Sequence, residues 1–436
     1  MLRLNTRHAN FEQRFRRLVD ERRESDDDVS HDVREIIAEV RRTGDDALAD
    51  YTMRYDKHAL TADLASWRVG AAQCKAAYEG LDNALRAALD LAAQRIRAYH
   101  EQQLPTDRDF TDNAGVRLGA KWLPVDAAGL YVPGGRAAYP SSLLMNAIPA
   151  RVAGVERLAV VTPTPHGNLN ELVLAAAYLA GVDEIWRVGG AQAVAALAYG
   201  TRRIRPVDVI TGPGNAWVAE AKRQLFGVVG IDMVAGPSEI LVISDNKSDP
   251  EWLAADLLSQ AEHDPASQSI LITDDLAFAN AVEDAVDLLS VQISTERVAR
   301  ASWDKHGTII NVQDLDAEAP DLANRLAAEH VELCIDDPDA MFAKIRHAGS
   351  VFMGRHTPEA VGDYVAGPNH VLPTGRRARF ASGLSVLDFM KRTSFLSVHE
   401  AALSRIGPAA VAMAQAEGLP AHARSVEIRL GKRMEK

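Results

Sequence analysis

Histidines stand near amide or carboxylate side chains in several separate segments of the 436-residue chain. The first pair is Gln260 and His263, three residues apart and therefore on one face of a predicted helix. We expect this helix to begin at Pro250, with Asp249 as its N-cap, and to run to about residue 263. Imidazole is a common zinc ligand, and a glutamine oxygen can join it beside a carboxylate. The pair fits a metal site or, alternatively, a helix end where a histidine interacts with the helix dipole.

Glu329 and His330 are adjacent where a predicted helix, residues 321–328, meets a predicted strand, residues 331–335. Neighbours within a strand point to opposite faces, so both can serve one site only at an irregular junction. A carboxylate and an imidazole have different ordinary pKa values, which suits chemistry with more than one proton transfer. The alternative is a surface glutamate beside a structural histidine.

Two further pairs of a carboxylate and an imidazole lie near the end of the chain. Asp363 and His370 fall in a loop rich in Gly and Pro, residues 362–373, and Glu417 and His422 lie close to the C-terminus. A long irregular loop in a compact protein is usually functional or disordered. Side chains from three distant segments could together form a metal site with both oxygen and nitrogen ligands. They are Gln260, His263, Asp363 and His422. Only folding or dimerisation could assemble that set.

Three glycine-rich turns follow predicted strands, at residues 130–136 (LYVPGGR), 188–192 (VGGAQ) and 210–217 (ITGPGNAW). The last is not the dinucleotide fingerprint, because Trp217 occupies the position of the third glycine. It can still present backbone N–H groups at a helix N-terminus, where phosphates bind. Such turns at the carboxyl ends of strands indicate a nucleotide crevice, although each alone is more often a plain tight turn.

Cys74 and Cys334 are the chain's two cysteines, too few for a disulfide framework or a cysteine-rich zinc module. A nucleophilic thiol would suit aldehyde oxidation. However, Val331, Leu333 and Ile335 indicate a buried strand, and alternation puts Cys334 on its opposite face. We therefore assign Cys334 no catalytic role.

The elements that must position these residues change in character along the chain. The first hundred residues are predicted to be helical, with one apolar stripe formed by Val33, Ile36, Ile37 and Val40. From about residue 120, short apolar runs alternate with helical stretches; the predicted strands are 129–132, 158–161, 185–188, 207–210, 240–243, 269–273, 308–311 and 331–335. Such alternation implies parallel sheets covered on both faces. Two α/β units in one chain imply a cleft between them.

Composition excludes several classes of protein. Hydrophobic residues at 47% and charged residues at 25% are typical of an ordinary soluble globular protein. A net charge of −12 argues against a nucleic-acid-binding protein. The longest apolar run, residues 172–182, is too short to span a bilayer, and the N-terminus lacks the apolar core of a signal peptide. We expect a cytoplasmic protein that binds neither nucleic acid nor membrane.

Seven long blocks resemble the histidinol dehydrogenase family, in the same order and over nearly the whole chain. They are residues 129–146, 188–201, 212–241, 256–265, 327–334, 362–395 and 417–426. The resemblance is specific because so many long blocks match; the first 25 residues or so are the least distinctive part.

The resemblance implies a zinc- and NAD-dependent enzyme that oxidises L-histidinol to L-histidine through bound L-histidinaldehyde, at the end of histidine biosynthesis. It also implies an α/β fold with two incomplete Rossmann-like domains, similar to the aldehyde dehydrogenase architecture, and small helical terminal segments. The family is a homodimer in which the C-terminal segment completes the partner's site. By this resemblance, residues 1–25 form an N-terminal helical segment and residues 383–436 form a helical tail. Residues 26–129 and 240–382 form the first α/β domain, which holds the metal and catalytic residues, and residues 130–239 form the second α/β domain, on the NAD side.

The family's functional residues match this sequence without a departure. One zinc ion per subunit would be held by Gln260, His263, Asp363 and His422. The catalytic pair would be Glu329 and His330. Substrate contacts would come from the metal ligands and His330, together with Ser238, His370 and Glu417. NAD contacts would come from Tyr131, Gln192 and Asn215.

Two other functions remain open at this point. The same scaffold could oxidise a related polar alcohol, but the presence of both His370 and Glu417 favours histidinol. A metal-dependent hydrolase or a non-catalytic metabolite-binding protein would show no dependence on a nicotinamide cofactor.

Overall fold

The computed structural model of the chain describes residues 1–21, 29–134, 139–234 and 236–431. Residues 22–25 of the expected N-terminal segment, and residues 135–136 of the first glycine-rich turn, lie outside the described residues. The chain forms two compact units, the first from residues 1–103 and 126–389, the second from residues 104–125 and 390–436. No helix in the described part of the chain is both long and apolar enough to cross a membrane.

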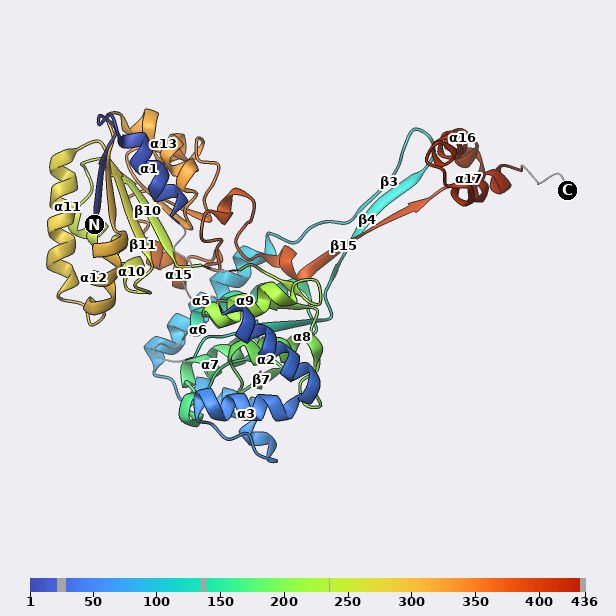
Figure 1. The fold of residues 1–436 in the computed structure, drawn as a ribbon, viewed down its shortest axis with the longest axis horizontal. Coiled ribbons are helices and arrows are strands. Elements are labelled where there is room, and N and C mark those ends of the chain that lie inside the picture. The colour runs from blue at the N-terminus through green and yellow to red at the C-terminus, as the bar shows by residue number, and fades with distance from the viewer. Residues whose placement is uncertain (22–28, 135–138, 235, 432–436) are drawn as a thin grey trace. The chain divides into compact units, whose positions relative to one another are not determined.

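The first unit contains two mainly parallel sheets with helices packed on both faces (Figure 1). One sheet has the strand order β1-β12-β11-β10-β13-β14, and every pairing in it is parallel. Its strands are β1 (Leu2–Asn5), β10 (Glu239–Ser244), β11 (Gln268–Thr273), β12 (Thr308–Asn311), β13 (His330–Cys334) and β14 (Ser350–Met353). The central strands are buried along their whole length, as expected for a parallel sheet covered on both faces.

Side chains that alternate along these strands build a separate core on each face. Leu241 and Ile243 of β10 pack with α1 (Phe11–Asp20) and α13 (Leu315–Leu326). Ile240 and Val242 pack with α10 (Pro250–Ala261), α11 (Leu276–Ser290) and α12 (Glu296–His306). Two further helices near this sheet are α14 (Pro338–Phe342) and α15 (Glu359–Tyr364).

The other sheet of the first unit has the order β2-β7-β6-β5-β8-β9 and is parallel except for β2, which runs antiparallel to β7. Its strands are β2 (Arg68–Val69), β5 (Ala127–Tyr131), β6 (Arg157–Val161), β7 (Glu184–Trp186), β8 (Val209–Thr211) and β9 (Gly230–Ile231). The helices packed around it are α2 (Ser30–Thr43), α3 (Asp45–Asp56), α4 (Ala71–Glu79), α5 (Asn83–Glu101), α6 (Pro140–Ala153), α7 (Glu171–Leu179), α8 (Gly190–Tyr199) and α9 (Ala216–Leu225).

The predicted parallel α/β architecture is confirmed, and most predicted elements lie within a few residues of the observed ones. Asp249 accepts a hydrogen bond from the N–H of Glu251, so α10 starts at Pro250 as predicted. The helix expected at 321–328 instead begins at Leu315, because Asp314 caps it by accepting from the N–H of Ala317.

The sheet pairings differ from the expected domain division at two places. Residues 2–5, expected in a helical segment, form β1, which pairs with β12. Residues 26–129 were expected to join 240–382, but α2 packs on α8 and α9, and β5 lies within the other sheet. The apolar stripe of α2 is buried in the core of that sheet, which explains the difference. A helical stripe predicts burial but not which sheet it covers.

The second unit is built from an antiparallel ribbon and a helical pair. Strand β4 (Arg117–Pro124) pairs with both β3 (Arg108–Thr111) and β15 (Met390–Ser397). Helices α16 (Glu400–Ala416) and α17 (Pro420–Glu427) pack on each other. The expected helical tail, residues 383–436, therefore contains a strand, β15, before helices α16 and α17, and this strand pairs with β4. Large apolar side chains are exposed on this unit, including Leu396 at 70% and Met413 at 65%.

Candidate active site

The end of α10 places Gln260 in a buried position beside His330. Gln260 is 1% exposed, and its Nε2 lies 3.3 Å from Nδ1 of His330. Its Oε1 is buried without a hydrogen-bond partner. Such an oxygen costs about 1–3 kcal/mol unless a ligand engages it. His263 lies just beyond the helix end and is exposed.

Glu329 and His330 are held by the two backbone polar groups of one residue, Glu239, at the start of β10. Oε2 of Glu329 accepts a hydrogen bond of 3.0 Å from the N–H of Glu239, and Nδ1 of His330 lies 3.1 Å from the Glu239 carbonyl oxygen. The two side chains approach each other to 3.8 Å. Both are buried, so the alternative of a surface glutamate is excluded. Glu329 lies just before β13 and His330 is the first residue of this strand, so the strand alternation does not separate their side chains.

The contacts of His330 fix which ring nitrogen can act as a base. We assign the proton to Nδ1, because the Glu239 carbonyl is its shortest contact and can only accept. Nε2 is then the unprotonated nitrogen, and it is buried without a hydrogen-bond partner. Burial lowers the pKa of His330 to about 3, and the imidazoles of His370 and His263 add to this effect. The ring is therefore neutral near pH 7, with a lone pair available for proton abstraction.

Burial has the opposite effect on Glu329. Desolvation raises the pKa of this carboxyl well above its ordinary value, and the nearby charges of Glu239, Asp363 and Glu359 raise it further. The hydrogen bond from the Glu239 N–H opposes the rise. A carboxylate of raised pKa is a better proton acceptor, which suits a general base.

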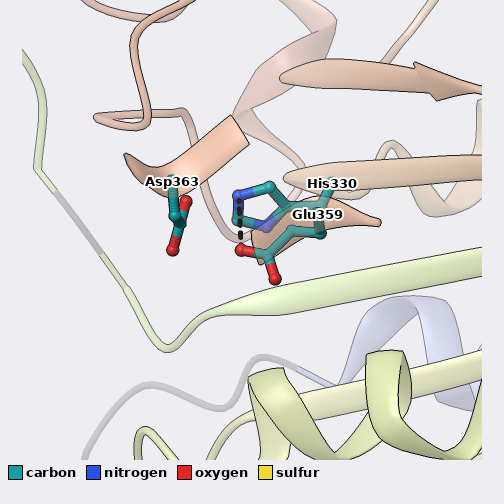
Figure 2. Close-up of side chains that lie close together, drawn as sticks. All are labelled: His330, Glu359 and Asp363. Carbon is teal, nitrogen blue, oxygen red and sulfur yellow. Dashed lines mark ion pairs between the residues drawn. The ribbon is translucent and has the colours of Figure 1, made fainter. Parts of the chain in front are cut away.

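Helix α15 contributes Glu359 and Asp363, which form a cluster of metal-ligand type with His330 (Figure 2). Ligand atoms of the three residues all lie within 4.8 Å of one another. Oε1 of Glu359 is 3.7 Å from Nε2 of His330 and has no hydrogen-bond partner. The Ser259 hydroxyl donates to the other oxygen of Glu359 at 3.0 Å. This cluster shares Asp363 with the expected metal set but also includes Glu359, which sequence reasoning did not select.

Two neighbouring carboxyl groups, those of Glu332 and Asp256, lie near the start of α15. Oε1 of Glu332 accepts a 2.6 Å hydrogen bond from the N–H of Glu359, and Glu332 is completely buried. Burial and the neighbouring Asp256 charge raise the pKa of Glu332 well above its ordinary value. Burial also raises the pKa of Asp256 to about 6, although its hydrogen bond with Glu332 opposes the rise. The hydrogen bond between the two carboxyl groups raises the pKa of Glu332 and lowers that of Asp256.

His370 connects the loop after α15 with α6. Nδ1 of His370 lies 3.0 Å from the carbonyl oxygen of Asp363, and Nε2 lies 3.4 Å from the hydroxyl of Ser142. Asn369 holds the same loop by donating to the Met145 carbonyl at 2.6 Å. Burial lowers the pKa of His370 to about 4, so the ring is neutral and can accept from Ser142. Ser142 was not selected from the sequence.

The remaining expected substrate residues fall in different places. Ser238 directly precedes β10 and is partly buried, and its carbonyl accepts from the N–H of Gln268 at 3.0 Å. Glu417 ends α16 and His422 lies in α17, and both side chains are exposed. The first unit thus brings Gln260, His330, Asp363 and His370 together, whereas Glu417 and His422 belong to the second unit.

The residues expected to contact NAD lie at the carboxyl ends of the sheet that contains β5. Tyr131 ends β5, and its hydroxyl accepts a hydrogen bond of 3.1 Å from the N–H of Gly190. Gln192 is buried in α8, and the exposed Asn215 caps α9 by accepting from the N–H of Val218. The chain runs from β5 to β6 and β7 on one side, then to β8 and β9 on the other. Ligands of open α/β sheets bind at such a switch point.

Comparison with known proteins identifies the family. A family model described as histidinol dehydrogenase matches residues 19–430. The chain belongs to the histidinol dehydrogenase family. It is 62% identical over 432 residues to a histidinol dehydrogenase of Zymomonas mobilis subsp. mobilis, covering 99% of this chain and 100% of that relative. It is 60% identical over 431 residues to the Rhodospirillum rubrum enzyme, covering 99% of each.

A solved structure agrees with these sequence comparisons. The crystal structure of histidinol dehydrogenase from Elizabethkingia anophelis matches with a TM-score of 0.93 and 34% identity, covering 99% of this chain and 98% of that one. The predicted resemblance to the histidinol dehydrogenase family is confirmed. The chain is an oxidoreductase of histidine biosynthesis.

The structure adds Glu359 and Ser142 to the site residues that were predicted from the sequence of this histidinol dehydrogenase. Glu359 stands four residues before Asp363, a spacing that places two carboxyls on one helical face, but this spacing is common on solvated helices. Ser142 lies inside a block that resembles the family, yet a serine in an apolar helix carries no chemical signal of its own. Only the packing of α6 against residues 369–370 gives it a partner.

Proposed function

We propose that this enzyme oxidises L-histidinol to L-histidine in two NAD+-dependent steps, through L-histidinaldehyde that stays bound, with one zinc ion per subunit. The observation that carries the proposal is that the backbone N–H and C=O of one residue, Glu239, hold Glu329 and His330 respectively. It leaves the unpaired Nε2 of His330 among side chains of metal-ligand type. Two bases at one position suit a substrate that must lose protons in two successive oxidations.

The described residues fit a zinc ion. The buried, unpaired Oε1 of Gln260 is the kind of atom that a metal would satisfy. Asp363 supplies a carboxylate within 4.8 Å of a ring nitrogen of His330, the histidine that lies beside Gln260. His263, just after the end of α10, would add an imidazole, and His422 would supply the fourth ligand. When bound, zinc would hold the imidazole and amino nitrogens of histidinol and so orient its carbinol.

His330 acts as the base of the alcohol oxidation. Its neutral ring, with Nδ1–H directed to the Glu239 carbonyl, presents Nε2 to the substrate hydroxyl and takes up its proton. Glu329 activates a water molecule against the aldehyde, and its raised pKa makes it a stronger proton acceptor for this task. His330 takes a second proton in the oxidation of the hydrated aldehyde.

NAD+ would lie at the switch point of the β5 sheet, where it would accept a hydride from the substrate carbon in each step. Tyr131, Gln192 and Asn215 are the proposed contacts. Ser238, His370 and Glu417 would hold the polar groups of histidinol. Retention of the aldehyde through proximity to the second base avoids the loss of a reactive intermediate.

We also propose that the enzyme is a homodimer in which the second unit of each subunit supplies Glu417 and His422 to its partner. Exposed apolar side chains such as Leu396 and Met413 on that unit are typical of an interaction surface.

The proposed location of the enzyme is the cytoplasm. Its two cysteines, Cys74 and Cys334, are free, which suits a reducing compartment.

The experiment that tests the proposal measures NADH absorbance with L-histidinol and NAD+. Metal-stripped enzyme should be inactive, and stoichiometric zinc should restore its activity; zinc added to buffer with NAD+ and histidinol alone is the control. Unchanged turnover in a thoroughly metal-free sample would refute the role of zinc. The absence of NADH from zinc-loaded enzyme would refute the proposed reaction.

A further inference from the structure

A fully buried ion pair lies behind the glycine-rich turn after β8. Lys222 comes from α9 and Asp232 follows β9, and their side chains are 3% and 1% exposed. Nζ of Lys222 donates to the carbonyl oxygen of Gly212 at 3.0 Å. Oδ2 of Asp232 accepts from the N–H of the same glycine at 2.8 Å. The two partners of the ion pair therefore hold the two polar groups of one residue.

Gly212 needs these partners because the sheet no longer provides them. The pairing of β5 with β8 ends at Thr211, so Gly212 lies one residue beyond the ladder. Its φ of +112° favours glycine, and a Cβ at this position would lie 2.1 Å from the carbonyl oxygen of Tyr131. The main chain of Gly212 thus packs directly against the end of β5.

The turn that begins at Gly212 ends at Asn215, the N-cap of α9. Lys222 lies in α9 itself. Its hydrogen bond to Gly212 therefore ties the first residue of the turn to the helix that follows the turn. Displacement of Gly212 would move both the contact with Tyr131 and the start of α9. A buried ion pair generally adds little stability over apolar side chains of the same volume, which favours a role in fixing geometry.

We propose that Lys222 and Asp232 are positioning residues for the dinucleotide: by fixing the backbone N–H and C=O of Gly212, they set Tyr131 and Asn215 at the spacing that the dinucleotide needs. The inference rests on the proposed function, since it assumes that NAD+ binds at this switch point. The residues act through the turn and do not themselves contact the substrate.

The test compares two double variants, each of which neutralises one ion pair beside the β5 sheet. Lys222→Met with Asp232→Asn removes both charges, so that no unpaired charge is left buried. The control is Arg157→Met with Glu184→Gln, a pair 3.6 Å apart at the opposite, amino-terminal ends of β6 and β7. KM for NAD+, KM for histidinol, kcat and the melting temperature are measured for both variants and the wild type.

We expect the Lys222/Asp232 variant to show a KM for NAD+ raised about tenfold or more, because an error near 1 Å in positioning is costly. Its KM for histidinol should stay within about twofold, and the control variant should keep the wild-type KM for NAD+. A lowered melting temperature with an unchanged KM for NAD+ would overturn the inference and leave the pair a purely structural role. A similar rise in the control variant would overturn it as well.

A replacement variant and the activity of the wild type settle the two cases in which the double variant alone would not be informative. If the double variant does not fold, Asp232→Asn alone keeps an oxygen toward the Gly212 N–H and is judged by the same criterion. If the wild type produces no NADH from histidinol, the proposed function has failed, and this inference fails with it. Wild-type activity with unaltered variants rejects the inference alone.

Discussion

The N–H of Glu239 binds Glu329, and the carbonyl oxygen of Glu239 lies 3.1 Å from Nδ1 of His330. Two adjacent residues that a regular strand would send to opposite faces therefore both contact the backbone of one residue, Glu239. Burial then moves their pKa values in opposite directions, upward for Glu329 and downward for His330. The result is a carboxyl group and a neutral imidazole whose roles can be separated by substitution.

Glu329→Gln should impair oxidation of histidinaldehyde far more than oxidation of histidinol. The amide keeps the shape of the side chain and an oxygen for the Glu239 N–H, but it cannot take a proton from water. Loss of a general base typically costs about 10²–10⁴-fold. The two half-reactions are measured separately, with each substrate in turn, and His330→Gln, expected to slow both, is the matched comparison. Equal losses in both half-reactions for Glu329→Gln would contradict this division of labour.

Glu332→Gln should flatten the pH dependence of stability in the metal-free protein. The raised pKa means that the native state keeps a proton that the unfolded chain releases above its value near 4.5. Stability is then full below that pH and falls as pH rises through the native-state pKa, by at most about 1.4 kcal/mol per pH unit for one proton. Glutamine keeps the acceptor for the Glu359 N–H and a donor toward Asp256.

Urea unfolding of metal-free wild type and Glu332→Gln at several pH values above 4.5 checks this prediction. The pKa of Glu332 is raised well above that value, and burial raises the pKa of its partner Asp256 to about 6. The free energy of unfolding should decline more steeply for the wild type. The exposed Glu101→Gln serves as the control and should follow the wild-type curve. Identical slopes for wild type and Glu332→Gln would show that this carboxyl carries no such proton.

Cys334→Ala should leave both oxidations intact. Cys334 is 3% exposed in the core that contains α10 and α11, on the face opposite Val331 and Leu333, as predicted from the sequence. Burial raises the pKa of its thiol, so the residue is a poor nucleophile. The smaller side chain should cost about 1–2 kcal/mol in unfolding free energy. A selective loss of histidinaldehyde oxidation would instead give the thiol a catalytic role.

Mixed dimers test whether the C-terminal segment completes the partner's site. Gln260→Ala and His422→Ala subunits, each expected to be inactive alone, are co-expressed with different tags and purified as heterodimers. If each site combines Gln260 of one subunit with His422 of the other, the heterodimer has one intact site and should regain about half of wild-type activity. A heterodimer of wild type with tagged wild type is the control.

Heterodimers as inactive as either parent would place Gln260 and His422 of one site in the same subunit. An enzyme that is active as a monomer would contradict the exchange more directly.

Local patterns predicted most elements, because caps and hydrophobic periodicity are properties of neighbouring residues. Asp249 and Pro250 marked the start of α10, and the alternation around Val331 placed Cys334 correctly. The sequence could not show that Gln260 lies beside His330, 70 residues away, since that contact depends on the packing of α10 over β13. Nor could it show that α2 covers the β5 sheet, because an apolar stripe does not specify its partner.

The amount of NADH formed from limiting histidinol tests the central claim most directly. With zinc-loaded enzyme and excess NAD+, the account predicts two NADH for each L-histidinol consumed, with L-histidine as the product and no free aldehyde trapped by an added amine reagent. One NADH per histidinol, with the aldehyde released to the trap, would contradict the proposal that Glu329 and His330 complete both oxidations at one site.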